Sequence, residues 1–442
     1  KGENIWDRYT HEHPYFMLDG SNGDIACDHY HKYKEDIALM KKMGIQFYRF
    51  SLSWSRILPT GFAYQVNPDG IRFYNDIINT LIENDIIPLV TMFHWDTPQP
   101  LQDLGAFANE MMVEWFEDYA RVVFENFGDR VKMWLTFNEP RQTCWEGIGL
   151  DRQAPDHNSS GIGDYLCAHN LIKAHARAYH LYDKKFKPRQ HGRVSLAVDA
   201  QWMVPKTNST ADKNAAERSL LFTFGWYTDP IYGRKGDYPE VMNKFVAERS
   251  KKEGFKKSRL PVFTKEEVAY IKGTYDFFGL NHYTSFTISD APEFPIGGKP
   301  SLVEDARLIA GQDPNWPSTA ADWLKIVPWG FTKTLKWIKH RYGNVPIIIT
   351  ENGLADYREI DDQDRINYHK LYLSALLDAI YNHNVKVEGY AIWSIMDNFE
   401  WRGGYVVGFG LYDVNFEDPE RKRTPKASVQ FYKNVIASRR IV

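Results

Sequence analysis

The sequence has little of what marks several large classes of protein. Its 442 residues hold only three cysteines, Cys27, Cys144 and Cys167, an odd and sparse count that predicts no disulfide framework. No apolar run is long enough to cross a bilayer. Charge is balanced, with Lys+Arg 54 against Asp+Glu 57, so no basic surface for nucleic acid or anionic membranes is indicated. We therefore expect neither nucleic acid nor a membrane among its partners.

Aromatic residues, in contrast, are plentiful. They make up 15% of the chain, with 14 Trp, 26 Tyr and 26 Phe. This content fits a large core, and it fits equally well a sugar-binding surface on which ring faces pack against the apolar faces of sugars. Composition alone does not choose between the two.

Short apolar segments alternate with amphipathic ones along the chain, which predicts a parallel sheet with crossover helices. The expected strands are Gln46–Ser53, Ile87–His94, Val131–Asn138, Arg193–Asp199, Phe277–Tyr283, Ile347–Glu351 and Val387–Ser394. The expected helices are Tyr30–Met43, Pro68–Asn84, Glu110–Phe127, Tyr165–Lys185, Pro328–Tyr342, Asp361–His383 and Pro425–Ser438. The fold class is thus α/β, a (β/α)8 TIM barrel, over a single catalytic domain spanning residues 1–442.

Seven strands are one fewer than a closed barrel needs. We expect the first strand to lie before residue 1, which leaves a gap between Gln46–Ser53 and Val387–Ser394. The Pro/Gly-rich stretch Ala291–Pro317 is interpreted as a long insertion between a strand and a helix.

Two glutamates stand at the ends of distant strands. Glu139 closes the segment Thr136–Pro140 (TFNEP), and Glu351 lies within Ile349–Gly353 (ITENG). Parallel barrels keep their chemistry at the carboxyl ends of the strands. Cleavage of a glycosidic bond needs two carboxyl groups, one to protonate the leaving oxygen and one to face the sugar carbon. The pair therefore predicts a glycoside hydrolase.

Further segments, in order along the whole chain, resemble glycoside hydrolase family 1, closest to the animal and especially insect-type β-glucosidases. They include Tyr48–Ser51 (YRFS), His94–Asp96 (HWD), Asn281–Tyr283 (NHY) and Asp397–Trp401 (DNFEW). The resemblance implies a retaining β-glycosidase that hydrolyses terminal non-reducing β-D-glucosyl residues by a two-glutamate double displacement. Glu139 would be the general acid/base, with a raised pKa, and Glu351 the nucleophile.

The resemblance also assigns supporting and substrate-binding roles. Arg49 would supply a cation to the nucleophile and Tyr283 a hydroxyl, and Asn138 would hold the sugar 2-hydroxyl. Glu400 would bind the 4- and 6-hydroxyls, which argues for a free sugar, because a carboxylate repels a 6-phosphate. The remaining substrate-binding residues are His94 and Trp401 at the 3-hydroxyl, Trp393 beneath the sugar ring, Trp323 at the leaving group, and Trp95 and Asn281.

Several positions depart from the family pattern. The segment Glu146–Pro155 (EGIGLDRQAP) differs from the usual Gly/Tyr-rich run, and Ala106-Phe107 stands where Gly-Trp is usual. The glutamine that binds the 3- and 4-hydroxyls in the family lies on the first strand, which this sequence does not contain. These departures leave the leaving-group preference open.

Two rival functions therefore stay open. One is a myrosinase-like thioglucosidase acting on glucosinolates. Its sulfated leaving group would require a basic residue in the binding site, and Arg141 is the candidate for that residue. The other is a non-catalytic family member that binds sugars or a receptor.

The expected partner is a small-molecule β-glycoside or oligosaccharide, with no cofactor and no metal, and a homodimer is compatible with the sequence. We expect a secreted or lumenal protein, although no signal peptide is visible and the chain begins like mid-domain sequence; the sequons at Asn158 and Asn208 give weak support.

Overall fold

A seven-stranded parallel sheet forms the centre of the molecule. The computed structural model describes residues 1–442. The sheet has the order β1-β2-β3-β4-β6-β9-β10, so each strand lies beside the next barrel strand along the chain. The strands are β1 (Phe47–Ser51), β2 (Ile87–Phe93), β3 (Met133–Asn138), β4 (Arg193–Asp199), β6 (Phe278–Asn281), β9 (Ile347–Glu351) and β10 (Val387–Tyr390). The curled sheet confirms the predicted (β/α)8 barrel class and the seven predicted strands, most of them a few residues shorter than expected.

The sheet is open between its first and last strands. β1 and β10 are its two edges, and no hydrogen-bonded ladder joins them. β1 is only partly buried along its length, whereas β2 is buried from its second residue onward. The ring of Phe47 lies about 3.5 Å from where a Cβ on Gly389 of β10 would stand, so the edges approach through a side chain. The predicted gap between these strands is confirmed.

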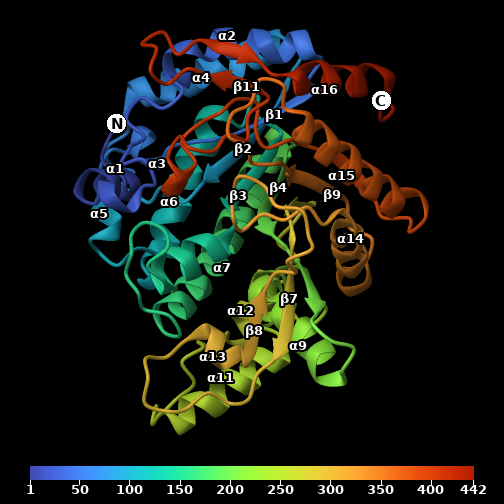
Figure 1. Ribbon diagram of the computed structural model, residues 1–442. Helices are drawn as coiled ribbons and strands as arrows, with labels where there is room; N and C mark the ends of the chain where they lie inside the picture. Colours follow the sequence, from blue (N-terminus) through green and yellow to red (C-terminus); the bar gives the residue numbers. More distant parts are fainter.

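Helices cover the outer face of the sheet, as the alternating pattern predicts (Figure 1). α4 illustrates how they begin, since Asn67 caps its first turn and Pro68 fills the first helical position, where no backbone donor is needed. α2 (His29–Met43) precedes β1, and the helices that follow the strands are α4 (Pro68–Glu83), α6 (Met112–Phe127), α7 (Gly163–Leu181), α14 (Pro328–Tyr342), α15 (Gln363–Tyr381) and α16 (Ala427–Ser438). Shorter helices are α1 (Ile5–Glu12), α3 (Trp54–Ile57), α5 (Gln99–Gln102), α8 (Lys187–Gln190) and α10 (Trp226–Tyr232). None of the helices has the length and apolarity that a membrane crossing requires.

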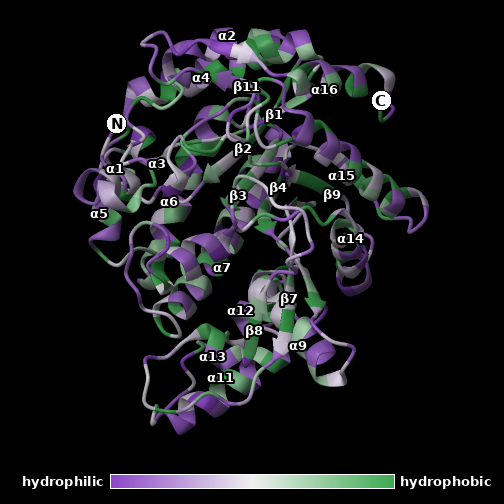
Figure 2. Cartoon of the chain, viewed as in Figure 1, coloured by the Kyte–Doolittle hydropathy of each residue, from purple (hydrophilic) through white to green (hydrophobic).

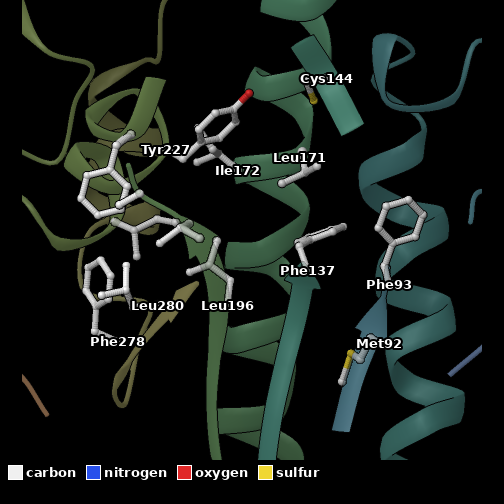
Figure 3. Close-up of a cluster of buried hydrophobic side chains, with 14 of the residues drawn as sticks. Met92, Phe93, Phe137, Cys144, Leu171, Ile172, Leu196, Tyr227, Phe278 and Leu280 are labelled. Atoms are coloured by element: carbon white, nitrogen blue, oxygen red, sulfur yellow. The ribbon is translucent and has the colours of Figure 1, made fainter. Parts of the chain in front are cut away.

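The main core lies between the strands and these helices. Phe93 of β2 and Phe137 of β3 meet edge to face with ring centroids 5.7 Å apart, and both belong to one large buried cluster with Leu171 of α7 (Figure 3). Inside the barrel, Leu89, Leu135 and other strand residues form a smaller cluster. Figure 2 shows β9, which reads Ile-Ile-Ile-Thr-Glu, as strongly hydrophobic. Strands buried on both faces hold their carboxyl-end residues rigidly in place.

A second, three-stranded sheet was not predicted. β5 (Trp202–Pro205) pairs in parallel with β7 (Ser285–Asp290), which pairs antiparallel with β8 (Leu308–Gly311). It lies in the lower lobe of Figure 1 with α9 (Thr210–Leu220), α11 (Glu240–Lys252), α12 (Lys265–Ile271) and α13 (Leu302–Ala306). The insertion Ala291–Pro317 therefore contains α13 and β8. A separate hairpin joins β11 (Tyr412–Val414) to β12 (Arg423–Pro425).

The expectation of no disulfide framework is wrong at one place. Cys144 and Cys167 form a disulfide, and both are fully buried. Cys144 lies on the π-helical turn η3 (Gln142–Gly149) and Cys167 on α7, so the bond ties the segment after Glu139 to a covering helix. The cysteine count was compatible with one pair plus one free thiol, and Cys27 is that thiol.

Candidate active site

The predicted site residues stand together at the carboxyl ends of the parallel strands. Asn138 ends β3 and Glu139 follows it, Asn281 ends β6, and Glu351 ends β9. His94 comes directly after β2. Because these strands are parallel neighbours in one sheet, their ends meet at one edge, which brings together residues separated by up to 257 positions (94 to 351).

Glu351 is surrounded by donors. Arg49 Nη1 lies 2.5 Å from Glu351 Oε1, and the Tyr283 hydroxyl donates to Oε2 at 2.7 Å. The Arg49 and Glu351 side chains are each only 6% exposed. A buried cation and a hydroxyl, one on each oxygen, stabilise the charged form of this carboxylate through charge-assisted hydrogen bonds. This is the state that a nucleophile requires.

Asn138 links Arg49 to His94. Its Oδ1 accepts from Arg49 Nη2 at 2.6 Å and from Asn281 Nδ2 at 3.1 Å. These two donors fix the amide orientation, so Asn138 Nδ2 must donate to His94 Nε2, 2.9 Å away. The His94 proton therefore resides on Nδ1. Burial and the nearby Arg49 charge lower the pKa of His94 well below its usual value, so the ring is neutral.

Glu139 has the opposite electrostatic environment to Glu351. Burial raises the pKa of Glu139 well above its usual value, and the carboxylates of Asp199 and Glu351 raise it further. Asn281 Nδ2 donates to its Oε1 at 2.7 Å, and this hydrogen bond opposes the rise. The protonated form is thus favoured, which suits a general acid.

The backbone is strained at three residues of the site. Glu139, Trp95 and Trp401 have φ values of 42°, 69° and 54°, in the left-handed region that side chains other than glycine rarely adopt. Such conformations persist where the surrounding structure enforces them, and they cluster at functional sites. At Glu139 the enforcing contact is a backbone hydrogen bond from its N–H to the carbonyl of Ala197 on β4, at 2.8 Å.

Rings and one further carboxyl group line the region beside His94. Trp401 lies 4.5 Å from Trp95 and 5.6 Å from His94 between ring centroids, and His94 lies 5.9 Å from Trp393. The Trp393 indole N–H donates to Glu400 Oε1 at 3.2 Å. Burial raises the pKa of Glu400 to about 8, so this group is mainly protonated at neutral pH.

Trp323 contacts Tyr283, the residue whose hydroxyl donates to Glu351. Its ring meets Tyr283 edge to face at 5.6 Å, and its side chain is 45% exposed. All the residues singled out from the sequence are therefore connected to one site through direct contacts, with Trp323 at its solvent-facing edge.

Sequence reasoning missed two features of the site. Thr350 donates its hydroxyl to Asn281 Oδ1 at 2.6 Å and thereby fixes which amide end faces Glu139. Asp199 binds Arg141, with Nη2 and Nε at 2.6 and 2.8 Å from Oδ2. Asp199 ends β4, and the strand-end rule that identified Glu351 could have found it.

A parallel barrel with two buried glutamates at the carboxyl ends of its strands, one paired with an arginine and one with a raised pKa, is the arrangement expected of a glycoside hydrolase. The family model for glycosyl hydrolase family 1 matches residues 1–441. The chain belongs to this family, and it is an O-glycosyl hydrolase by class.

Curated relatives and solved structures agree with this membership. Myrosinase 1 of the aphid Brevicoryne brassicae is 47% identical, with 99% of this chain and 93% of the relative covered. Human cytosolic beta-glucosidase is 42% identical, with 99% and 92% covered. The aphid myrosinase structure has a TM-score of 0.94 over 99% of this chain and 94% of that one, at 47% identity. A rice beta-glucosidase mutant in a covalent complex with glucose has a TM-score of 0.93 at 39% identity, with 98% and 93% covered.

Proposed function

We propose that the protein is a retaining β-glycosidase that hydrolyses terminal non-reducing β-D-glucosyl residues, with residues 1–442 acting as one catalytic domain. The observation that carries this proposal is the contrast between the two glutamates. Arg49 and Tyr283 hold Glu351 as an anion, while burial between two carboxylates favours a proton on Glu139. Two carboxyl groups with opposed environments are the pattern of an acid and a nucleophile.

The reaction would proceed in two displacements. Glu351 attacks the anomeric carbon while Glu139 gives its proton to the leaving oxygen, which forms a glycosyl ester on Glu351. Glu139, now ionised, takes a proton from water, and the resulting oxygen nucleophile releases the sugar with its original configuration. The retaining route needs a carboxyl separation of about 5–5.5 Å. The covalent glucose complex of the rice relative supports this route by analogy.

The sugar would be held by the residues around the two glutamates. Asn138, whose amide orientation is fixed by Arg49 and Asn281, would bind the 2-hydroxyl. Neutral His94 carries its proton on Nδ1 and would bind the 3-hydroxyl, with Trp401 beside it. The remaining proposed contacts are Glu400 to the 4- and 6-hydroxyls, Trp393 under the ring, Trp95 beside Trp401, Asn281 behind Glu139, and Trp323 against the leaving group.

The likeness to aphid myrosinase keeps thioglucoside hydrolysis as a second candidate. A glucosinolate carries a sulfate, which would need an available cation. Arg141, the candidate named from the sequence, already donates to Asp199 and, at 3.2 Å, to Glu146. A guanidinium between two carboxylates has no net positive charge to offer a sulfate. This engagement favours O-glucosides with neutral leaving groups over glucosinolates.

The presence of both glutamates, with their donors, argues against a non-catalytic sugar-binding member.

We also propose that the protein matures in a secretory or lumenal compartment. The buried Cys144–Cys167 disulfide is typical of an oxidising compartment, and the sequon residues Asn158 and Asn208 are both exposed. The homodimer stays a prediction.

A hydrolysis panel tests the proposal. Purified enzyme is given an aryl β-glucoside, cellobiose and sinigrin as the glucosinolate, with Glu351→Gln as the inactive control. We expect turnover of the aryl glucoside, with kcat/KM above that for sinigrin. Faster hydrolysis of sinigrin would replace the O-glucosidase assignment with a thioglucosidase, and no turnover of any substrate would favour a binding protein.

A further inference from the structure

Arg141 and Asp199 form a buried ion pair next to the proposed acid. Arg141 lies two residues after Glu139, and its Nη2 and Nε both donate to Asp199 Oδ2. The Arg141 and Asp199 side chains are 14% and 4% exposed. Glu146, 12% exposed, accepts from the remaining arm of Arg141 at 3.2 Å. One cation thus sits between two carboxylates, and the three charges sum to −1.

Asp199 belongs to a row of strand-end residues. It stands in register with Asn281 of β6, and Asn281 stands in register with Glu351 of β9. Glu139 is hydrogen bonded to the middle member of this row through Asn281 Nδ2. The proposed acid therefore lies between two carboxylates, one on each side. Each carboxylate has its own arginine, Arg49 for Glu351 and Arg141 for Asp199.

We propose that Asp199, clamped by Arg141, is a positioning residue that keeps Glu139 in its proton-donating form. The inference rests on the proposed function, since it concerns the acid of that reaction. Two effects act in the same direction. The Asp199 charge disfavours a second anion at Glu139, and its hold on Arg141 keeps that guanidinium from pairing with Glu139 instead. Without Asp199, Arg141 would be free to hold Glu139 as a carboxylate.

Other groups around Glu139 must be weighed. Burial gives the largest rise in the pKa of Glu139, and it is common to all the variants considered below. Of the neighbouring charges, Asp199 on β4 raises the pKa of Glu139 more than Glu351 on β9 does. The hydrogen bond from Asn281 and the charge of Arg141 lower this pKa. Among the other groups of the site, Arg49 pairs with Glu351 and the Tyr283 hydroxyl donates to it. His94 is neutral, and Glu400 interacts electrostatically with Glu351. Asp199 is thus the charge that can be changed without removing the nucleophile.

Removing either member of the pair should shift activity in opposite directions along the pH axis. The basic limb of kcat/KM reports ionisation of the acid in the free enzyme. In Asp199→Asn we expect this limb to move to lower pH by about one unit or more, as for a lost neighbouring charge. In Arg141→Gln we expect it to move to higher pH, and the double variant should lie between the two. Glu146→Gln removes the other carboxylate partner of Arg141 but leaves Asp199 in the row of strand ends, so we expect its basic limb to move less than that of Asp199→Asn.

A second readout separates this inference from the proposed function. Difference infrared titration, with Glu139→Gln as the reference, follows protonation of the Glu139 carboxyl group whether or not a substrate is turned over. The same direction of shift should appear there in Asp199→Asn. A glucoside-hydrolysing wild type whose Asp199→Asn variant keeps both its basic limb and its infrared midpoint would overturn the role of Asp199 and leave the proposed function standing. Shifts in the same direction for Asp199→Asn and Arg141→Gln would also overturn it, because a general loosening of structure would explain them.

Discussion

Arg49 joins the proposed nucleophile to the proposed 2-hydroxyl ligand. One arm of its guanidinium contacts Glu351 at 2.5 Å and the other contacts Asn138 at 2.6 Å. Arg49 stands on β1, an edge strand of the open sheet, while its partners stand on β9 and β3. One side chain therefore both stabilises the charge of the proposed nucleophile and orients the proposed 2-hydroxyl ligand, Asn138.

Replacing Arg49 by Met should therefore damage catalysis severely. Loss of one partner leaves a buried carboxylate uncompensated, which costs about 3–5 kcal/mol. We expect kcat/KM for an aryl β-glucoside to fall at least about 100-fold. Arg193→Met is the matched control, because Arg193 stands at the first residue of β4, at the opposite end of the strand from the site, and pairs with Glu388. Equal losses in both variants would show that fold damage, rather than the Glu351 contact, causes the effect.

Tyr283→Phe removes the second donor to Glu351. A hydrogen bond to a charged group is worth about 1.5–3 kcal/mol, so kcat should fall about 10- to 100-fold. Tyr119→Phe deletes another buried hydroxyl, which donates to the carbonyl of Met92 at 2.9 Å, and should leave kcat close to that of the wild type. Unchanged turnover in Tyr283→Phe would remove this hydroxyl from the mechanism.

Glu139→Gln should harm substrates according to their leaving groups. Good leaving groups need little protonation, so a dinitrophenyl glucoside should retain much more of its first-displacement rate than an alkyl glucoside. The measurement is kcat/KM for each substrate, which reports the steps up to and including the first displacement. The same loss for both substrates would exclude Glu139 as the acid.

Strand order was predictable from the sequence, and the second sheet was not. The predicted bounds of Arg193–Asp199 and Ile347–Glu351 match the structure, because both are short, largely apolar segments that end on a carboxylate. β5 and β8 are four-residue strands with exposed or half-buried residues, so they carry no such signal. β5 pairs with β7 across 83 positions (Trp202 opposite Ser285), a contact that the local sequence pattern does not show.

In the site, too, features with a local sequence signal were predictable and features that depend on tertiary contacts were not. The glutamates, His94 and the tryptophans were identified by residue type and place in the motifs. The Arg141–Asp199 pair, the Thr350 contact and the disulfide were not, because each depends on which strand or helix lies beside which. The raised pKa of Glu400 was not predictable either, because it comes from burial in the folded protein, which the sequence motif does not show.

The raised pKa of Glu400 gives a pH-dependent choice between free and phosphorylated sugars. Below about pH 8 the protonated form predominates, and above it the carboxylate would, in its proposed role, bind hydroxyls by charge-assisted bonds and repel a 6-phosphate. We expect the ratio of kcat/KM for an aryl β-glucoside to that for its 6-phosphate to rise between pH 7 and pH 9, values that bracket this pKa. The ratio cancels the ionisation of Glu139, which both substrates share. In Glu400→Gln the ratio should stay constant, and a wild-type ratio that falls with pH would contradict the role of Glu400.

The Cys144–Cys167 disulfide should contribute to stability, because it closes a loop with a sequence separation of 23 residues. Loop-closure entropy gives about 3 kcal/mol for a loop of this order. We expect the Cys144→Ala/Cys167→Ala double variant to unfold at lower urea concentration than the wild type, and Cys27→Ala to change little. Reductant should destabilise only proteins that retain the pair. An unchanged midpoint in the double variant would show that the bond does not stabilise the fold.

The identity of the residue that bonds to the sugar tests the central claim most directly. A 2-fluoro-β-glucoside with a good leaving group slows both displacements, the second more than the first, so the glycosyl-enzyme accumulates and can be digested and sequenced by mass spectrometry. The account predicts one sugar per chain, attached to Glu351, and no label in Glu351→Gln. Turnover of β-glucosides without any covalent label, or a label on another residue, would contradict it.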